Sequence, residues 1–331
     1  MNVPPFSLDS QLSELGDELD ESVLRVLRGG KYIGGEEVTS FEKLFASEIG
    51  VDYAVGCNSG TDALVLALRA LNIGAGDEVI TPSFSFFATA EAISIVGAKP
   101  VFVEVDANYL IDLECIKEAI TSATKAILPV HLFGRPVDMG SLMRIAKKND
   151  LKVIEDCAQA TGAQWNGRPV GSFGDVGCFS FFPTKNLGAA GDAGAVTTKQ
   201  PQIAQLIREL ALHGMPHRYF HTNLGYNSRL DSIQAAVLNV KLTRLSSWIK
   251  KRESIAMRYM ELLDDLPGLR LPKPMNKNKT IHGWNQFVVR VENISLQGNI
   301  GIQEKNIFPQ YEELRGVIDS KDRDHLKNNL E

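Results

Sequence analysis

The chain is short of cysteine, of excess positive charge and of long apolar runs. Its four cysteines, Cys57, Cys115, Cys157 and Cys178, are widely separated and include no C-x-x-C pair, which argues against disulfide staples and zinc sites. The 40 acidic residues outnumber 35 Lys and Arg, and no basic stripe is interleaved with aromatics, so charge does not support a nucleic-acid partner. No apolar run approaches the ~20 residues that span a bilayer, and the N-terminus lacks the pattern of a secretory signal. We therefore expect a cytoplasmic protein without membrane association.

The residues that are present indicate a large α/β protein. At 331 residues, the chain exceeds the usual single-core size of ~100–200 residues, so a large domain and a smaller one are expected. Apolar strand-like runs alternate with amphipathic helical segments at 87–96 and 139–148, which is typical of a mainly parallel sheet. The predicted strands begin at residues 78, 99, 125, 152 and 176. A long helical stretch, 231–266, is expected to lead into the second domain.

One lysine is set among small, flexible residues behind an apolar run. It lies in the segment Ser180-Phe-Phe-Pro-Thr-Lys185-Asn-Leu-Gly188, which continues through Gly191 to Gly194. Taken alone, Lys185 would be interpreted as an ordinary solvated surface charge. The glycines do not form a dinucleotide-binding fingerprint, because no strand-to-helix turn with a downstream acid accompanies them.

Two further segments favour a chemical role for that lysine. Residues 151–156 predict a buried strand that ends in Glu155 and Asp156, and ligands bind at the carboxyl ends of such strands. Ser59-Gly60-Thr61-Asp62 precedes a run of helix formers, and a helix N-terminus offers free N–H groups to a phosphate. Alone, this second segment would be a simple capped helix. Together, an anion site, an acid and an amine are the three contacts that pyridoxal 5'-phosphate (PLP) requires.

Several ordered motifs resemble one family, the DegT/DnrJ/EryC1/StrS sugar aminotransferases of PLP fold type I. The matching segments are Gly30-Lys-Tyr-Ile-Gly34, 59–64, 82–89, His131-Leu-Phe-Gly134-Arg-Pro136, Glu155-Asp156-Cys-Ala-Gln159, 180–185, His213-Gly214 and 225–236. The resemblance implies an aspartate aminotransferase-like α/β large domain with a mostly parallel central sheet and a smaller C-terminal α+β domain. We assign residues 1–240 to the first and 241–331 to the second.

The resemblance also implies roles for individual residues. Lys185 would bind PLP as a Schiff base, and Asp156 would pair with the ring nitrogen, while the adjacent Glu155 should face the other side of the strand. The remaining positions carried over are Gln159 near the ring hydroxyl, Phe86 stacked on the ring, and Gly60, Thr61, Asp62 (through its backbone N–H) and Ser180 at the phosphate. Core packing is an equally plausible role for Phe86.

One residue implies an oligomer. Asn227 matches a position that in the family reaches the phosphate of the neighbouring subunit, so a homodimer with shared sites is expected. Without the resemblance, Asn227 would be interpreted as a turn residue. His213, His217 and His221 are spaced four apart, but Gly214 and Pro216 interrupt any common helix, and no metal site is expected.

The resemblance weakens near the C-terminus. Residues 284–290 predict a strand of the small domain, and the helix start that normally follows closely is matched only at Arg323-Asp-His-Leu. The domain is therefore expected to be atypical from about residue 291, with an inserted segment and without the family's final elements.

The resemblance implies transfer of an amino group from an amino acid, by family analogy L-glutamate, to a nucleotide-linked keto-sugar. Two alternatives remain open: another PLP reaction on the same scaffold, and a noncatalytic PLP-binding or regulatory remnant.

Overall fold

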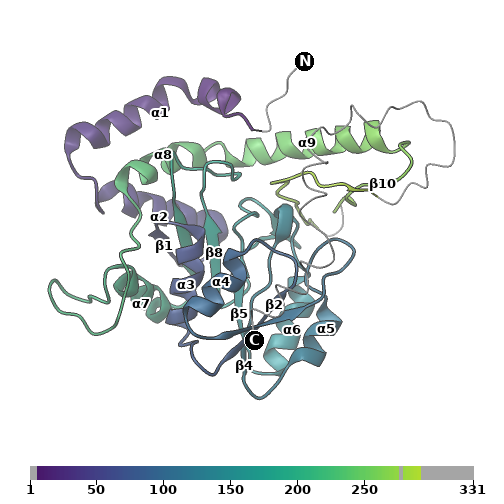
Figure 1. Cartoon of the computed structure of the whole chain (residues 1–331). Helices are drawn as coiled ribbons and strands as arrows, with labels where there is room; N and C mark the ends of the chain where they lie inside the picture. Colours follow the sequence, from purple (N-terminus) through teal and green to yellow (C-terminus); the bar gives the residue numbers. More distant parts are fainter. Residues whose placement is uncertain (1–5, 276–278, 292–331) are drawn as a thin grey trace, which may run out of the picture. The chain divides into compact units, whose positions relative to one another are not determined.

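A seven-stranded sheet is the framework of the protein, seen in a computed structural model that describes residues 6–275 and 279–291 (Figure 1). Among its seven strands only β9 runs against the others, so the predicted mostly parallel α/β sheet is confirmed. The strands lie in the order β1 (Tyr53–Cys57), β9 (Gly194–Thr198), β8 (Val176–Ser180), β5 (Lys152–Asp156), β4 (Thr124–Ile127), β2 (Glu78–Pro82) and β3 (Lys99–Val103).

Helices α2 to α7 pack against strands of this sheet, whereas α1 packs against α8. The helical elements of the described residues are α1 (Asp9–Gly29), α2 (Glu36–Ile49), α3 (Gly60–Ala70), α4 (Ala88–Ile95), α5 (Leu113–Ala119), the 3-10 turn η1 (Leu132–Gly134), α6 (Met139–Lys148), α7 (Pro201–Ala211), α8 (Ser232–Leu242) and α9 (Leu245–Leu263). Short strands complete the elements: β6 (Gln164–Trp165), β7 (Arg168–Pro169), β10 (Leu269–Arg270) and β11 (Arg290–Val291). The helices predicted at 87–96, 139–148 and within 231–266 are confirmed.

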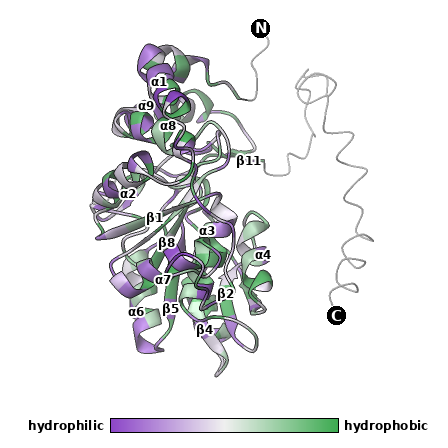
Figure 2. Ribbon diagram, turned by 90° about the vertical axis from the view of Figure 1, so that its left-hand side faces the viewer, coloured by the Kyte–Doolittle hydropathy of each residue, from purple (hydrophilic) through white to green (hydrophobic). Residues whose placement is uncertain are grey.

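Alternating side chains of the strands divide the interior into two apolar cores. On β1, Ala54 packs into a core with Phe41 and Phe45 of α2, whereas Val55 packs into a core with the apolar residues of α3. This division follows from the two-residue period of a strand. Figure 2 shows the central strands coloured mainly as hydrophobic, while α1 and α2 carry hydrophilic stripes. The sheet is therefore buried on both faces, and its strand ends are the part open to ligands.

The helix that follows β1 begins where its sequence provides a cap. Ser59 accepts a hydrogen bond on its side-chain oxygen from the backbone N–H of Asp62 at 3.0 Å. The next residues, from Ala63 to Leu68, are all buried, and most of them are strong helix formers. The cap fixes the first turn of α3 directly beyond the carboxyl end of β1.

One predicted element is wrong. Residues 284–289 do not form a strand, and only Arg290 of the predicted run lies in β11. The backbone at Trp284 is left-handed, with φ 46°, and the N–H of Asn285 bonds the carbonyl of Phe133 at 3.0 Å instead of a strand partner. This segment is therefore tied to η1 rather than to a sheet.

The contacts divide the chain between Arg290 and Val291, where the family resemblance weakens. The predicted insertion from about residue 291 and the Arg323 segment lie outside the described residues. The boundary expected at residue 240 remains a prediction. None of the helices described is both long and apolar enough to cross a membrane.

Candidate active site

The predicted site residues gather at one edge of the sheet, where the parallel strands end. Asp156 is the last residue of β5 and Ser180 is the last residue of β8. Gly60 follows the end of β1 by three residues, and Phe86 follows the end of β2 by four. Carboxyl ends of parallel strands meet at a common edge, which is where open α/β sheets bind their ligands.

Asp156 is a buried carboxylate with two local donors. One oxygen accepts from the hydroxyl of Thr89 on α4 at 2.9 Å, and the other accepts from the backbone N–H of Ala158 at 3.0 Å. Burial raises the pKa of Asp156, while these hydrogen bonds and the nearby charge of Lys185 act in the opposite direction. The group is therefore held in place, but burial outweighs the contacts that favour its ionised form.

Lys185 lies in the turn after β8 and is partly buried. Its backbone N–H bonds the carbonyl of Phe182 at 2.8 Å, which closes the turn. Loss of solvent lowers the pKa of the ammonium, whereas the charge of Asp156 acts to raise it. A lysine with a lowered pKa exists more often as the neutral amine, which is the nucleophilic form.

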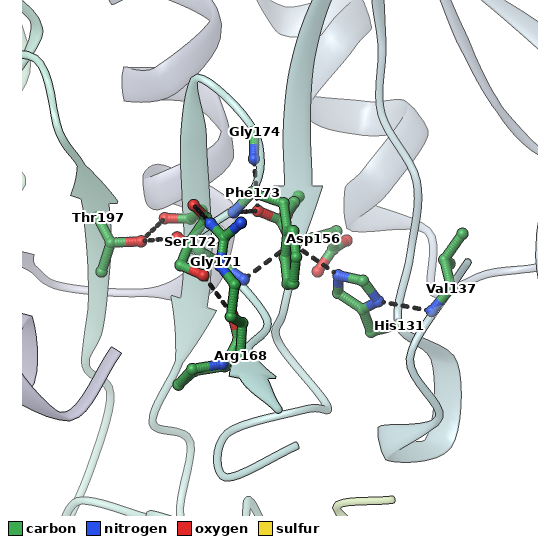
Figure 3. Close-up of polar contacts among 12 residues, drawn as sticks. His131, Val137, Asp156, Arg168, Gly171, Ser172, Phe173, Gly174 and Thr197 are labelled. Carbon is green, nitrogen blue, oxygen red and sulfur yellow. Dashed lines mark hydrogen bonds and ion pairs between the residues drawn. The ribbon is translucent and has the colours of Figure 1, made fainter. Parts of the chain in front are cut away.

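Glu155 faces a different set of partners from Asp156, as alternation along a strand requires. One oxygen accepts from His131 Nε2 at 3.1 Å and from the N–H of Gly171 at 2.9 Å, and the other accepts from the N–H groups of Phe173 and Gly174 at 2.8 Å each (Figure 3). The side chain is fully buried. Glu155 thus anchors the loop after β7 and is not available to a ligand.

His131 is fixed in one neutral tautomer between two elements. Its Nδ1 accepts from the backbone N–H of Val137 at 3.0 Å, so Nε2 carries the proton that is donated to Glu155 (Figure 3). Its own backbone N–H donates to the carbonyl of Asp156 at 3.0 Å. His131 therefore holds the end of β5 through the side chain of Glu155 and the backbone carbonyl of Asp156.

The start of α3 packs directly against the end of β8. A Cβ placed on Gly60 would lie 2.6 Å from the Cβ of Ser180, so only glycine permits this approach. The backbone N–H groups of the first helical turn and the Ser180 hydroxyl consequently lie together, as an anion site requires. Thr61 lies in this turn. The carboxylate of Asp62 accepts from the Ser228 hydroxyl and its backbone N–H donates to the Ser59 side chain, so the phosphate contact expected of that N–H remains a prediction.

The other predicted residues differ in their exposure. Phe86 is 72% exposed, which excludes the core-packing role in this chain and leaves its ring free to contact a ligand. The amide oxygen of Gln159 accepts from the N–H of Phe133 at 2.7 Å, so its amide NH₂ remains as a donor. Asn227 is exposed beside Ser228. The individual ligand contacts of these residues remain predictions.

Four supporting residues were not singled out by role from the sequence. They are Thr89 and His131, which hold Asp156, and Asn186 and Lys241, which hold the turn of Lys185. Asn186 donates from its amide to the carbonyls of Thr161 at 3.1 Å and Gly283 at 2.7 Å. Lys241, only 2% exposed, donates to the carbonyl of Gly188 at 2.8 Å. The family motifs contain Thr89 and His131, but nothing in the sequence marks the pairing of Lys241 with Gly188.

One group of potential metal ligands occurs within residues 6–275 and 279–291. Ligand atoms of His131, Glu155 and Cys157 lie within 4.8 Å of one another. However, the His131 nitrogen and both Glu155 oxygens are already hydrogen-bonded, and burial raises the pKa of Cys157 well above its usual value, which keeps the thiol protonated. The group is therefore interpreted as a structural network.

Comparison with known proteins identifies the same architecture. The sequence profile of the DegT/DnrJ/EryC1/StrS aminotransferase family matches residues 13–304. A UDP-N-acetyl-3-dehydro-alpha-D-glucosamine 3-aminotransferase from Acidithiobacillus ferrooxidans is 48% identical over 290 residues, which cover 87% of this chain and 78% of the relative. A dTDP-3-amino-3,4,6-trideoxy-alpha-D-glucose transaminase from Streptomyces venezuelae is 45% identical, with 88% and 76% covered.

Solved structures agree with the sequence relatives. The crystal structure of S. venezuelae DesV superimposes with a TM-score of 0.84 at 45% identity, covering 87% of this chain and 78% of DesV. NtdA from Bacillus subtilis, solved with bound cofactor PMP, gives a TM-score of 0.81 at 33% identity, with 88% and 67% covered.

Proposed function

Because the chain belongs to the DegT/DnrJ/EryC1/StrS aminotransferase family, whose members depend on PLP, we propose that it transfers an amino group from an amino acid to a nucleotide-linked keto-sugar. L-Glutamate is the proposed donor. The observation that carries the proposal is the convergence of Lys185, Asp156 and the Gly60–Ser180 contact at one sheet edge.

The residues present fit the cofactor. A buried acid with a raised pKa, a lysine with a lowered pKa and a helix N-terminus packed on a serine match the ring nitrogen, aldehyde and phosphate of PLP respectively. When bound, PLP supplies an electron sink for the negative charge that develops at the amino acid's α-carbon. We assign the phosphate to Gly60, Thr61, Asp62 and Ser180, and the ring to Phe86, Gln159 and Asp156.

Lys185 has two tasks in this proposal. Its neutral amine would hold the cofactor's aldehyde as a nucleophile, and the same side chain would move a proton at the amino acid's α-carbon as a general base and acid. Desolvation lowers its pKa, which increases the neutral fraction that nucleophilic attack and proton abstraction need. Asp156 contributes the opposite charge: its buried carboxylate is stabilised by a protonated nitrogen placed beside it, and in return keeps that proton in position.

We propose that the active unit is a homodimer in the cytoplasm. Three large apolar side chains on the segment after α7 are strongly exposed: Tyr219 (80%), Phe220 (60%) and Leu224 (87%). Monomeric soluble proteins rarely leave such groups together in water, and Asn227 follows directly on the same segment. In a dimer joined over this segment, Asn227 of each copy would reach the phosphate of the other.

The test is a half-reaction with the amino donor alone. Purified protein loaded with PLP should convert one equivalent of L-glutamate per site to 2-oxoglutarate. In a separate sample without glutamate, borohydride treatment should leave the pyridoxyl label on Lys185. Lys185→Ala should lower the rate by about 100- to 10,000-fold, the usual range for a general acid or base. Lys199→Ala is the control, because the pKa of Lys199 is also lowered, although its amine bonds Ser172 outside the site.

Other results would identify the alternatives. A protein that binds PLP but yields no 2-oxoglutarate would be a noncatalytic binder. A protein that reacts with the amino acid but transfers the amino group to none of the nucleotide-linked keto-sugars tested would indicate another PLP reaction.

A further inference from the structure

One face of α8 bonds the backbone of the segment that follows Lys185. Gln234 accepts on its amide oxygen from the backbone N–H of Ala190 at 2.8 Å, and Lys241 donates its ammonium to the carbonyl of Gly188 at 2.8 Å. The two side chains are seven residues apart, which places them on the same face of the helix and two turns from each other. We call this pair, Gln234 and Lys241, the α8 clamp.

The clamped segment is closely folded. A Cβ placed on Gly188 would lie 2.5 Å from the carbonyl oxygen of Pro183, so only glycine allows the chain to return this close to the start of the turn. Leu187 and Ala189 are buried in the same apolar core as Leu238 of α8. Packing therefore brings the segment against the helix, and the clamp fixes where along the helix it lies.

The charge of Lys241 has no acidic partner within residues 6–275 and 279–291. The side chain is almost fully buried, and burial lowers the pKa of its ammonium. A buried charge is costly unless hydrogen bonds compensate for the lost water, and an apolar side chain would fill the same space without this cost. The bond to Gly188 is therefore the interaction that lysine provides here and an apolar residue does not.

The backbone around Lys185 is held at other points as well. The N–H of Lys185 bonds the carbonyl of Phe182, and the next residue, Asn186, bonds the carbonyls of Thr161 and Gly283 through its side chain. The α8 clamp adds the attachment to a long helix. The turn of Lys185 is thus fixed on the side of the small segments at 161 and 283 and on the side of α8.

We propose that Lys241, as part of the α8 clamp, is a positioning residue for Lys185: it keeps the turn closed so that the Lys185 amine stays partly buried in the candidate site. This role deepens the proposed function and rests on it, because it concerns the amine assigned to the cofactor's aldehyde. Without the clamp, the turn moves toward solvent and takes the amine with it. A displacement of about 1 Å at a reacting group can lower a rate on the order of 100-fold.

The first measurement uses the protein without PLP. Trace acetylation at a series of pH values, followed by peptide mass spectrometry, gives the pKa of the Lys185 amine. Lys241→Met keeps nearly the size of the side chain but removes the donor, so the pKa of Lys185 should rise toward that of a solvated lysine. Gln234→Leu removes the other half of the clamp and should shift the pKa of Lys185 in the same direction. If Lys241→Met does not fold, Gln234→Leu carries the test.

The second measurement uses the PLP-loaded protein. Lys241→Met should bind PLP about ten-fold more weakly, the usual effect of one lost charge-assisted hydrogen bond, and its glutamate half-reaction should slow by about 100-fold. Lys241→Arg keeps the charge and a donor and should recover part of both losses. Val240→Ala is the matched control on the same helix. Val240 packs instead with Leu15 and Leu19 of α1, so its truncation lowers stability without removing a bond of the clamp.

The pKa of Lys185 decides the outcome. A raised value in Lys241→Met and Gln234→Leu, together with the wild-type value in Val240→Ala, supports the positioning role. A value that is unchanged in the clamp variants, or that shifts equally in Val240→Ala, overturns it, because the effect is then absent or reflects lost stability alone. Acetylation needs neither cofactor nor turnover, so a wild-type protein that fails the glutamate half-reaction would refute the proposed transaminase function separately.

Discussion

The conservative substitution Glu155→Gln tests the buried network beneath the candidate site. Each carboxylate oxygen accepts two N–H groups, from His131 and Gly171 on one side and from Phe173 and Gly174 on the other. A glutamine keeps the size of the side chain but has only one acceptor oxygen, so in either orientation its NH₂ faces two buried donors. An unsatisfied buried donor costs about 1–3 kcal/mol. We therefore expect unfolding free energy to fall by about 2–6 kcal/mol, a large part of the ~5–15 kcal/mol typical of a domain.

The assay is equilibrium unfolding in urea, followed by circular dichroism at a fixed protein concentration without PLP. Glu114→Gln is the control, because Glu114 is 80% exposed and pairs with Lys117 at the surface, and its loss should cost at most about 1 kcal/mol. Glu155→Gln should also weaken PLP binding, since the carbonyl of Asp156 is held by the same His131. A stability within ~0.5 kcal/mol of the wild type would refute the hydrogen-bonding argument.

Three further perturbations give distinct results. Gly60→Ala should weaken PLP binding at least ten-fold while the fold is retained, because the new methyl would lie 2.6 Å from the Cβ of Ser180. Gly29→Ala is the control, since its methyl would meet nothing within 4 Å among the described residues. Equal PLP titrations for the two variants would contradict the contact. Because the pKa of Asp156 is raised in the folded protein, its contribution to apo-protein stability is present below the pKa of the unfolded chain and is lost as pH rises through the folded pKa. Asp156→Asn should therefore raise the melting temperature at alkaline pH, and it should abolish transamination. A lower melting temperature at alkaline pH would contradict this sign. The pKa of His282 is lowered to about 3, so its contribution to stability is present above the ordinary histidine value of 6.5 and is lost as pH falls toward 3. His282→Gln should therefore reduce the slope of unfolding free energy against pH by about 1.4 kcal/mol per pH unit between these values, as measured by urea unfolding. An unchanged slope would argue against a buried neutral imidazole.

Much of the fold could be predicted because its signals are local. The strand ending at Asp156 and the start of α3 within residues 59–62 are set by a few consecutive residues, and both occur where the sequence places them. The likeness of motifs to a known family supplied the site residues, because Lys185 or Gly60 alone has an ordinary structural interpretation. Alternation along β5 was enough to separate Glu155 from Asp156.

Contacts between distant segments could not be predicted in the same way. The run from Trp284 to Arg290 has the composition of a strand, yet the N–H groups of its second and third residues bond the carbonyl of Phe133 in η1, which lies far earlier in the chain. Lys241 on α8 donates to the carbonyl of Gly188, a residue of a turn that lies 53 positions earlier in the chain. Neither pairing leaves a periodic or local signal, since it depends on how elements meet in three dimensions.

The contact between α3 and β8 has a consequence for binding energy. Gly60 and Ser180 are held in van der Waals contact by the packing of the protein itself, and the Ser59 cap fixes the first turn of the helix. A ligand arriving there needs to immobilise little of the protein, so less of its intrinsic affinity is lost as conformational entropy. A cofactor bound through its phosphate at this site could change the orientation of its ring without a rearrangement of α3 or β8.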